Sequence, residues 1–313
     1  MKQIILNHMK IIYTILLLMN FLGAINGKNE SKNNIVNFEK TFAKNEKRKL
    51  ELENYIIVIY GMDVQYSSGF TAEYRIGSIN YIEYENVQYR IDEALSISAN
   101  KEMKIYIFHN VTSLSYFFDS SYDSNVKQII SVDFSNFNSL LITGLKSMFF
   151  ACSSLQTINF RNFITSNVED MSYMFDGCTQ LQSLDLSSFD TSKAIRMMSM
   201  FQQCIALKSL DLSNFNTPLL QQSVQMFDGC TQLESIILSN FKSSLIKNPN
   251  KMFKGCTNLK YLDIQNCDDV TSTSISSMFD DIDNLKYINI YNVVSNGYLA
   301  TAISNALNDR ANL

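Results

Sequence analysis

The stretch MFDGCTQLQSLDLSSFDTS, residues 174–192, decides the fold, because most of it returns 26 residues later. A dipeptide that recurs six times at one fixed interval is the signature of a tandem repeat. It occurs at Met148-Phe149, Met174-Phe175, Met200-Phe201, Met226-Phe227, Met252-Phe253 and Met278-Phe279. Apolar residues keep the same register after each methionine, and a looser copy begins near residue 114. The chain therefore contains an array of 26-residue units.

Each unit combines two kinds of apolar spacing. Leu184 and Leu186 are two residues apart, which is the spacing of one face of a strand. The stretch SNVEDMSYMF, residues 166–175, has the spacing of a helix face and begins with a capping box, Ser166 and Glu169. Three units then place a glycine where a helix would end with a positive φ. These glycines are Gly177, Gly229 and Gly255.

One unit cannot bury its own apolar face, but stacked units can. The sequence therefore predicts an α/β solenoid with one short parallel strand and one short helix per 26-residue turn. Residues 174–192 and 200–217 resemble the BspA-like leucine-rich repeat surface proteins, and the resemblance extends over about 114–303. It implies a leucine-rich-repeat-type solenoid that is secreted or attached to a surface and serves attachment or recognition. The asparagine row usual in leucine-rich repeats is expected to be absent, with phenylalanine in its place.

The rest of the chain predicts an exported protein with a small all-β region ahead of the array. A basic start followed by the apolar run 11–25 is the order of a signal peptide, and the run is short for a membrane span. Cleavage would leave no transmembrane segment and a secreted or cell-surface location, whereas a retained signal would be an anchor. Sequons at Asn29 and Asn110 would make an exported eukaryotic chain a glycoprotein. The predicted segments are a signal peptide (1–27), a polar spacer (28–52), a small β domain or N-terminal cap (53–110), a degenerate first repeat (111–147), the repeat solenoid (148–297) and a C-terminal capping helix (298–313).

Composition argues against catalysis and against nucleic-acid binding. A net charge of −4 lacks the basic surface that neutralises phosphates. The chain has two histidines, no C-x-x-C, no G-x-S-x-G and no glycine-rich phosphate loop, so we expect no enzyme activity, no cofactor and no metal. Two alternatives stay open: an enzyme with a site in 53–110 or at the domain junction, and a structural component of a surface coat.

Three sets of chemically reactive residues favour structural roles. Five cysteines lie in register, so their side chains point the same way, and we expect buried free thiols rather than disulfides or a zinc site. An outward row of aspartates is expected to be solvated rather than to bind a cation. His109 is expected at the surface. The two rows are Cys152, Cys178, Cys204, Cys230 and Cys256, and Asp185, Asp211 and Asp263.

The outward strand positions change from small polar residues to tyrosine along the array. Tyrosine clusters are typical of binding surfaces, because the ring offers contact area together with a hydroxyl. The partner would be a protein or glycan on a surface, and the sequence does not identify it. In the alternative, the final helix, 298–309, folds back over the rings. The candidate ligand-binding residues are Ile237, Tyr261, Asp263, Tyr287 and Tyr291.

Overall fold

The structure is a computed structural model that describes residues 54–66, 78–242, 245, 249–266, 277–292, 297, 299 and 301–304. The chain divides into two units, 1–53 and 54–313, and every described residue belongs to the second. The predicted signal peptide, the spacer and the sequon at Asn29 therefore lie outside the described residues, as does Cys267.

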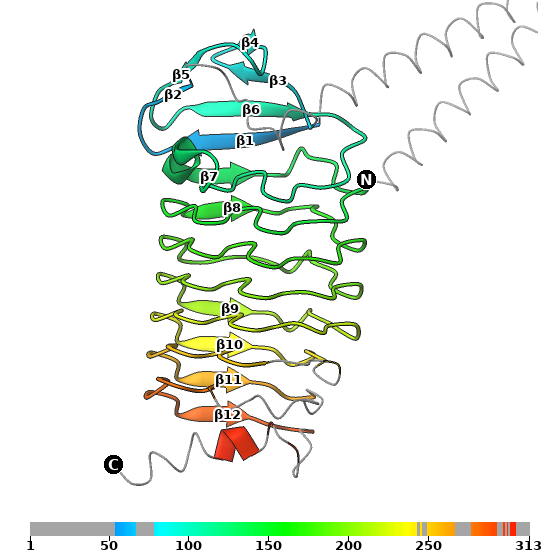
Figure 1. Cartoon of the computed structure of the whole chain (residues 1–313), viewed down its shortest axis with the longest axis vertical. Helices are drawn as coiled ribbons and strands as arrows, with labels where there is room; N and C mark the ends of the chain where they lie inside the picture. The colour runs from blue at the N-terminus through cyan, green and yellow to red at the C-terminus, as the bar shows by residue number, and fades with distance from the viewer. Residues whose placement is uncertain are drawn as a thin grey trace, which may run out of the picture. The chain divides into compact units, whose positions relative to one another are not determined.

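The small β region and the first repeats share one six-stranded sheet. Its order is β4-β3-β6-β1-β7-β8, in which β4, β3, β6, β1 and β7 pair antiparallel and β8 adds parallel to β7. The β region therefore continues into the repeats through the pairing of β1 with β7 (Figure 1). The strands are β1 (Tyr55–Tyr60), β3 (Ile79–Tyr84), β4 (Val87–Tyr89), β6 (Glu102–Ile107), β7 (Ile129–Asp133) and β8 (Thr157–Asn159), while β2 (Val64–Tyr66) and β5 (Leu95–Ile97) form a separate antiparallel pair.

The later repeats form a second, parallel sheet in the order β12-β11-β10-β9. Each strand is three residues long, and paired residues are 26 positions apart, so every repeat makes one coil of a β-solenoid. Residues 183–185 hold the same place in the coil between β8 and β9 without a strand assignment. The strands are β9 (Ser209–Asp211), β10 (Ser235–Ile237), β11 (Tyr261–Asp263) and β12 (Tyr287–Asn289).

The predicted helix in each unit is wrong, and with it the α/β leucine-rich-repeat class. In the coil that contains Met148, alternate amides donate to the carbonyl three residues back, as from Met148 to Leu145 and from Cys152 to Phe149. The amides between them donate to the next coil, as from Phe149 to the Met174 carbonyl (2.9 Å). This backbone is a chain of tight turns bonded to its neighbours, whereas an α-helix would bond within itself.

In these turns the backbone returns to the same side about every three residues, close to the 3.6 residues per turn of an α-helix. The apolar residues on the buried side therefore have nearly the same spacing in both structures. Ser166 and Glu169 consequently cap no helix. Gly177 has the expected positive φ of 76°, but it serves one of these turns, and Tyr173 adopts the same left-handed backbone with a φ of 59°. Among the described residues, helix is confined to the 3-10 turn η1 (Ser124–Gln128) and to residues 299 and 301–304. No helix in this part of the chain is both long and apolar enough to cross a bilayer.

Aromatic rings form the centre of the core. One phenylalanine from each coil stacks on the next, with ring centroids 5.3–5.7 Å apart and ring planes within 12° of parallel. Because these rings are buried, each coil closes the apolar surface of its neighbour. This phenylalanine column consists of Phe118, Phe149, Phe175, Phe201, Phe227, Phe253 and Phe279.

Polar side chains also connect successive coils. Asn214 donates through Nδ2 to the carbonyls of Leu186 (3.0 Å) and Phe189 (2.9 Å) in the preceding coil. Asn240 bonds to the preceding coil at another carbonyl, that of Ser213, at 2.9 Å. Asn214 and Asn240 each directly precede a buried phenylalanine, Phe215 and Phe241, so both residue types line these two coils at adjacent positions.

Candidate functional site

The candidate surface is the outward face of the parallel sheet. It arises because successive side chains along each strand point alternately outward and into the core. In β9 the pattern is exposed, buried, exposed, so Ser209 and Asp211 point outward and Leu210 points into the core. Pairing in register carries these positions from coil to coil. One outward row runs Ser209, Ser235, Tyr261, Tyr287, and the other runs Asp211, Ile237, Asp263, Asn289.

Three tyrosines form the aromatic end of this face and are called here the tyrosine strip: Tyr261, Tyr287 and Tyr291. Tyr261 and Tyr287 are register partners in β11 and β12, and Tyr291 follows β12 along the chain. Their exposed fractions are 36%, 68% and 67%, so the described residues do not cover the rings. Leu299 and Ile303, from the segment predicted to fold back over the rings, are instead buried in the hydrophobic core.

Asp263 lies in the outward row but is only 6% exposed. Its carboxylate accepts hydrogen bonds from the Gln265 amide (3.0 Å), from Asn289 Nδ2 (3.2 Å) and from the Tyr261 hydroxyl (3.4 Å). Asp263 therefore fixes Tyr261 and Asn289 in place rather than projecting toward a ligand. Ile237, the other candidate in this row, is half-buried.

The other outward aspartates also have a local role. In Asp185 and Asp211, Oδ1 accepts the amide of the residue two positions on, at 2.9 Å in both cases, which is the bond of an Asx turn. Hydrogen bonds from Ser187 lower the pKa of Asp185. Each aspartate thus ends its strand segment and starts the next turn. In the described part of the chain, no group of three His, Cys, Asp or Glu residues is placed to hold a metal ion.

The predicted row of buried free thiols is confirmed. All five described cysteines are free and buried. Each Sγ donates to a phenylalanine carbonyl of the preceding coil at 3.0–3.2 Å, as from Cys178 to Phe149. Burial raises the pKa of the Cys178, Cys204, Cys230 and Cys256 thiols, so they stay protonated and act as hydrogen-bond donors.

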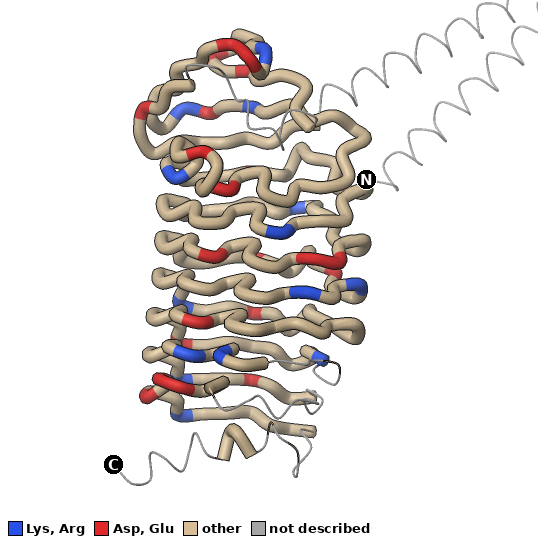
Figure 2. Tube along the Cα trace, viewed as in Figure 1, with Lys and Arg blue, Asp and Glu red and all other residues tan. Residues whose placement is uncertain are grey.

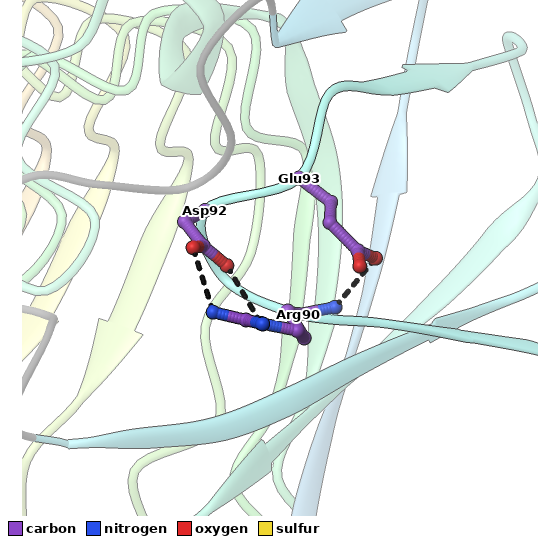
Figure 3. Close-up of polar contacts among 3 residues, drawn as sticks. All are labelled: Arg90, Asp92 and Glu93. Atoms are coloured by element: carbon purple, nitrogen blue, oxygen red, sulfur yellow. Dashed lines mark hydrogen bonds and ion pairs between the residues drawn. The ribbon is translucent and has the colours of Figure 1, made fainter.

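The β region carries charges that bond to one another. Arg90 forms two bonds with the Asp92 carboxylate (2.9 and 3.1 Å), and its amide donates to Glu93 at 3.0 Å (Figure 3). These three residues close the exposed loop between β4 and β5. On the sheet itself, Lys104 pairs with Glu83 at 2.6 Å.

His109 and Asn110 are both exposed where the β region meets the first repeat. Figure 2 shows acidic and basic residues interspersed along the coils.

Sequence reasoning missed one titratable residue, Asp176. It follows Met174-Phe175 and is half-buried. Burial, and to a lesser degree the charge of Asp228, raise its pKa from 3.8 to about 7. Asp176 and Asp228 hold the same position two coils apart, and this recurrence of a carboxylate beside the buried Met-Phe pair was the available signal.

One family, described as "Mycoplasma protein of unknown function, DUF285", matches the chain over residues 112–234, 143–259 and 206–311. These overlapping matches correspond to the tandem coils described above. No curated protein and no solved structure matches the chain. Because the matched residues, 112–311, make up more than half of the 313-residue chain, the protein belongs to the DUF285 family of repeat proteins.

Proposed function

We propose that the protein is a non-catalytic recognition protein, secreted or held at a cell surface, that binds its partner through the outward face of the solenoid sheet. The observation that carries this proposal is the tyrosine strip, in which the exposed Tyr261 and Tyr287 are register partners on a regular sheet and the exposed Tyr291 follows β12. Exposed aromatic clusters are uncommon on surfaces without a partner, and tyrosine is enriched where proteins bind.

The scaffold behind the strip is suited to binding without rearrangement. Inter-coil backbone bonds, the phenylalanine column and the side-chain bonds of Asp263 hold the strip from below. A rigid surface loses little conformational entropy when it binds, and a tyrosine side chain has few rotamers to lose.

The location rests on the sequence. The basic start, the apolar run and the small residues after it support export, and the resemblance of the repeats to BspA-like surface proteins supports a role in attachment. Expression of the full chain with a C-terminal tag, followed by N-terminal sequencing of the secreted product, tests this part. A chain that stays in the cell with its first 27 residues intact would contradict it.

Binding is tested with immobilised extracts of cell-surface proteins and glycans and the full chain in solution. The variant pair Tyr287→Ala and Tyr291→Ala should lose retention because it removes the exposed rings. The matched pair Asp185→Asn and Asp211→Asn, on the same face but away from the strip, should keep it. Retention that survives the tyrosine changes and disappears with the aspartate changes would place binding elsewhere on the sheet.

A further inference from the structure

The tyrosine strip is too small to be the core of an ordinary protein–protein interface. The three rings together expose less than two whole tyrosines would, roughly 350 Å² at about 200 Å² per aromatic side chain. A stable protein interface buries about 800 Å² on each partner. The outward positions that continue the face are Ser235, Ser209, Asp211 and the half-buried Ile237, and serine and aspartate are depleted in such interfaces.

The outward positions of the strip itself carry no free charge, although the exposed Lys260, paired with Glu234 at 2.8 Å, and the exposed Lys286 precede Tyr261 and Tyr287. These outward positions are occupied by Tyr261, Asp263, Gln265, Tyr287, Asn289 and Tyr291, with no lysine or arginine among them. The one carboxylate is buried and accepts hydrogen bonds from three donors. A phosphate or an acidic peptide would therefore find cations only beside the strip, at Lys260 and Lys286, and a basic ligand would find no exposed carboxylate within it.

What the strip does offer is flat rings beside fixed amides. Asn289 accepts the Tyr291 amide (3.2 Å) and donates to Asp263 (3.2 Å), which locks its side chain between the two exposed rings of β12 and the following turn. Tyr287 and Tyr291 are four residues apart along the chain, a span of at most about 14 Å. Tyr261 lies about 4.8 Å from Tyr287 on the neighbouring strand.

From this combination we infer that the ligand of the strip is a neutral oligosaccharide, whose sugar rings stack on Tyr287 and Tyr291. The apolar C–H face of a pyranose ring packs against an aromatic ring, and its hydroxyls form hydrogen bonds with amide and phenol groups at the rim. The span between the two tyrosines accommodates two or more linked sugars. This inference rests on the proposed function and names the class of partner.

The test is calorimetric titration of the full chain with neutral tetrasaccharides of β-1,4-linked glucose, β-1,4-linked N-acetylglucosamine, β-1,4-linked mannose and α-1,4-linked glucose. The chain has no tryptophan, so tyrosine fluorescence gives a second readout of ring stacking. We expect saturable binding of at least one tetrasaccharide. The Tyr287→Ala, Tyr291→Ala variant should weaken it at least about tenfold, because two ring contacts are lost.

Two variants control the experiment. The Tyr287→Phe, Tyr291→Phe variant keeps the rings and should bind within about threefold of wild type. Tyr122→Ala removes a ring that is 63% exposed but lies outside the strip, and it should have no effect. All of these side chains are exposed, so circular dichroism should show an unchanged fold.

Absence of saturable binding up to about 10 mM for every tetrasaccharide would overturn the inference, as would equal binding by wild type and the double alanine variant. Retention on deglycosylated surface proteins that depends on the tyrosines would leave the proposed function standing and replace the glycan with a protein. Retention that ignores the tyrosines would overturn both.

Discussion

Thr165 Oγ1 both donates a hydrogen bond to the Asp190 carbonyl (2.9 Å) and accepts one from the Asp190 amide (2.8 Å), so one buried hydroxyl satisfies both backbone groups of a residue in the next coil. Thr191 and Thr217 hold the position of Thr165 in the next two coils, and Thr217 makes the same pair of bonds with Lys242. At this position of the coil, the threonine hydroxyl connects adjacent coils by side-chain-to-backbone hydrogen bonds, where a β-sheet would use backbone-to-backbone bonds.

Thr165→Val should therefore destabilise the fold although it changes the shape of the side chain very little. It removes two hydrogen bonds and leaves the Asp190 amide and carbonyl without their partner, at a total cost of about 1–3 kcal/mol. Urea unfolding followed by far-UV circular dichroism measures the loss. Thr157→Val is the matched control, because Thr157 is exposed and bonds only to the Ser131 hydroxyl in the same sheet face, and it should change stability by less than about 0.5 kcal/mol. Equal losses of stability in Thr165→Val and Thr157→Val would show that the two bonds between Thr165 and Asp190 do not stabilise the fold more than a surface hydroxyl bond does.

The phenylalanine column predicts that losing a ring from its middle costs more stability than losing the last ring. Phe201 is buried between Phe175 (5.6 Å) and Phe227 (5.4 Å), so Phe201→Ala removes two stacked contacts and leaves a cavity, at about 3–5 kcal/mol. Phe279 stacks on Phe253 alone within the described residues and is more exposed, so Phe279→Ala should cost distinctly less. The difference is read from the urea midpoints of the two variants, and equal midpoints would argue against a stacked column as the source of stability.

The repeat itself was readable from the sequence, and so were the inward and outward sides of its strands. The 26-residue return of Met-Phe requires stacked coils whatever their local structure, and the two-residue spacing of Leu210 and Leu212 assigns both to the core, where both are buried. The helix was mistaken because Met171, Met174 and Phe175 have the same spacing in a series of three-residue turns as in a helix. The two differ in backbone φ, which is left-handed at Tyr173, and in the hydrogen bonds to the next coil, and residue types reveal neither.

The sequence predicted the exposed tyrosines of the site but not the burial of Asp263. Alternation placed Tyr287 and Tyr291 on the outward face, and both rings are exposed. It also placed Asp263 there as a ligand contact, but its burial depends on the bonds from Tyr261 and Asn289, which are side-chain geometry. Asp176 escaped attention because its raised pKa arises from how deeply neighbouring coils enclose it.

Ser223 offers a stabilising substitution. It is fully buried where the three preceding coils place Leu145, Met171 and Met197, and its hydroxyl has no hydrogen-bond partner. Ser223→Ala removes a desolvated polar group without adding volume, so the free energy of unfolding should rise by about 1 kcal/mol. Thermal unfolding of the full chain measures the gain. Ser213→Ala, at an exposed position, should leave the midpoint where it is, and a lower midpoint for Ser223→Ala would mean that the hydroxyl is satisfied in solution.

The last prediction concerns pH and follows from Asp176. Because its folded-state pKa is raised from 3.8 to about 7, chiefly by burial, the folded protein keeps a proton that the unfolded chain releases above pH 4. The contribution of Asp176 to stability is therefore most favourable below pH 4, declines as the pH rises toward 7, and stays at its lower level above pH 7. Asp176→Asn cannot ionise, so it should match wild type near pH 4 and exceed it increasingly up to pH 8. The measurement is the urea midpoint of both proteins across this range.

Asp185→Asn is the control, because the pKa of Asp185 is shifted in the opposite direction. Hydrogen bonds from Ser187 lower the pKa of Asp185, so wild type gains stability from the carboxylate above about pH 4. The Asp185→Asn variant should therefore not become more stable than wild type at pH 8. If the midpoints of Asp176→Asn and wild type differ by the same amount at pH 4 and at pH 8, then Asp176 ionises in the folded protein as freely as in the unfolded chain, and the coils around it do not exclude water as the structure indicates.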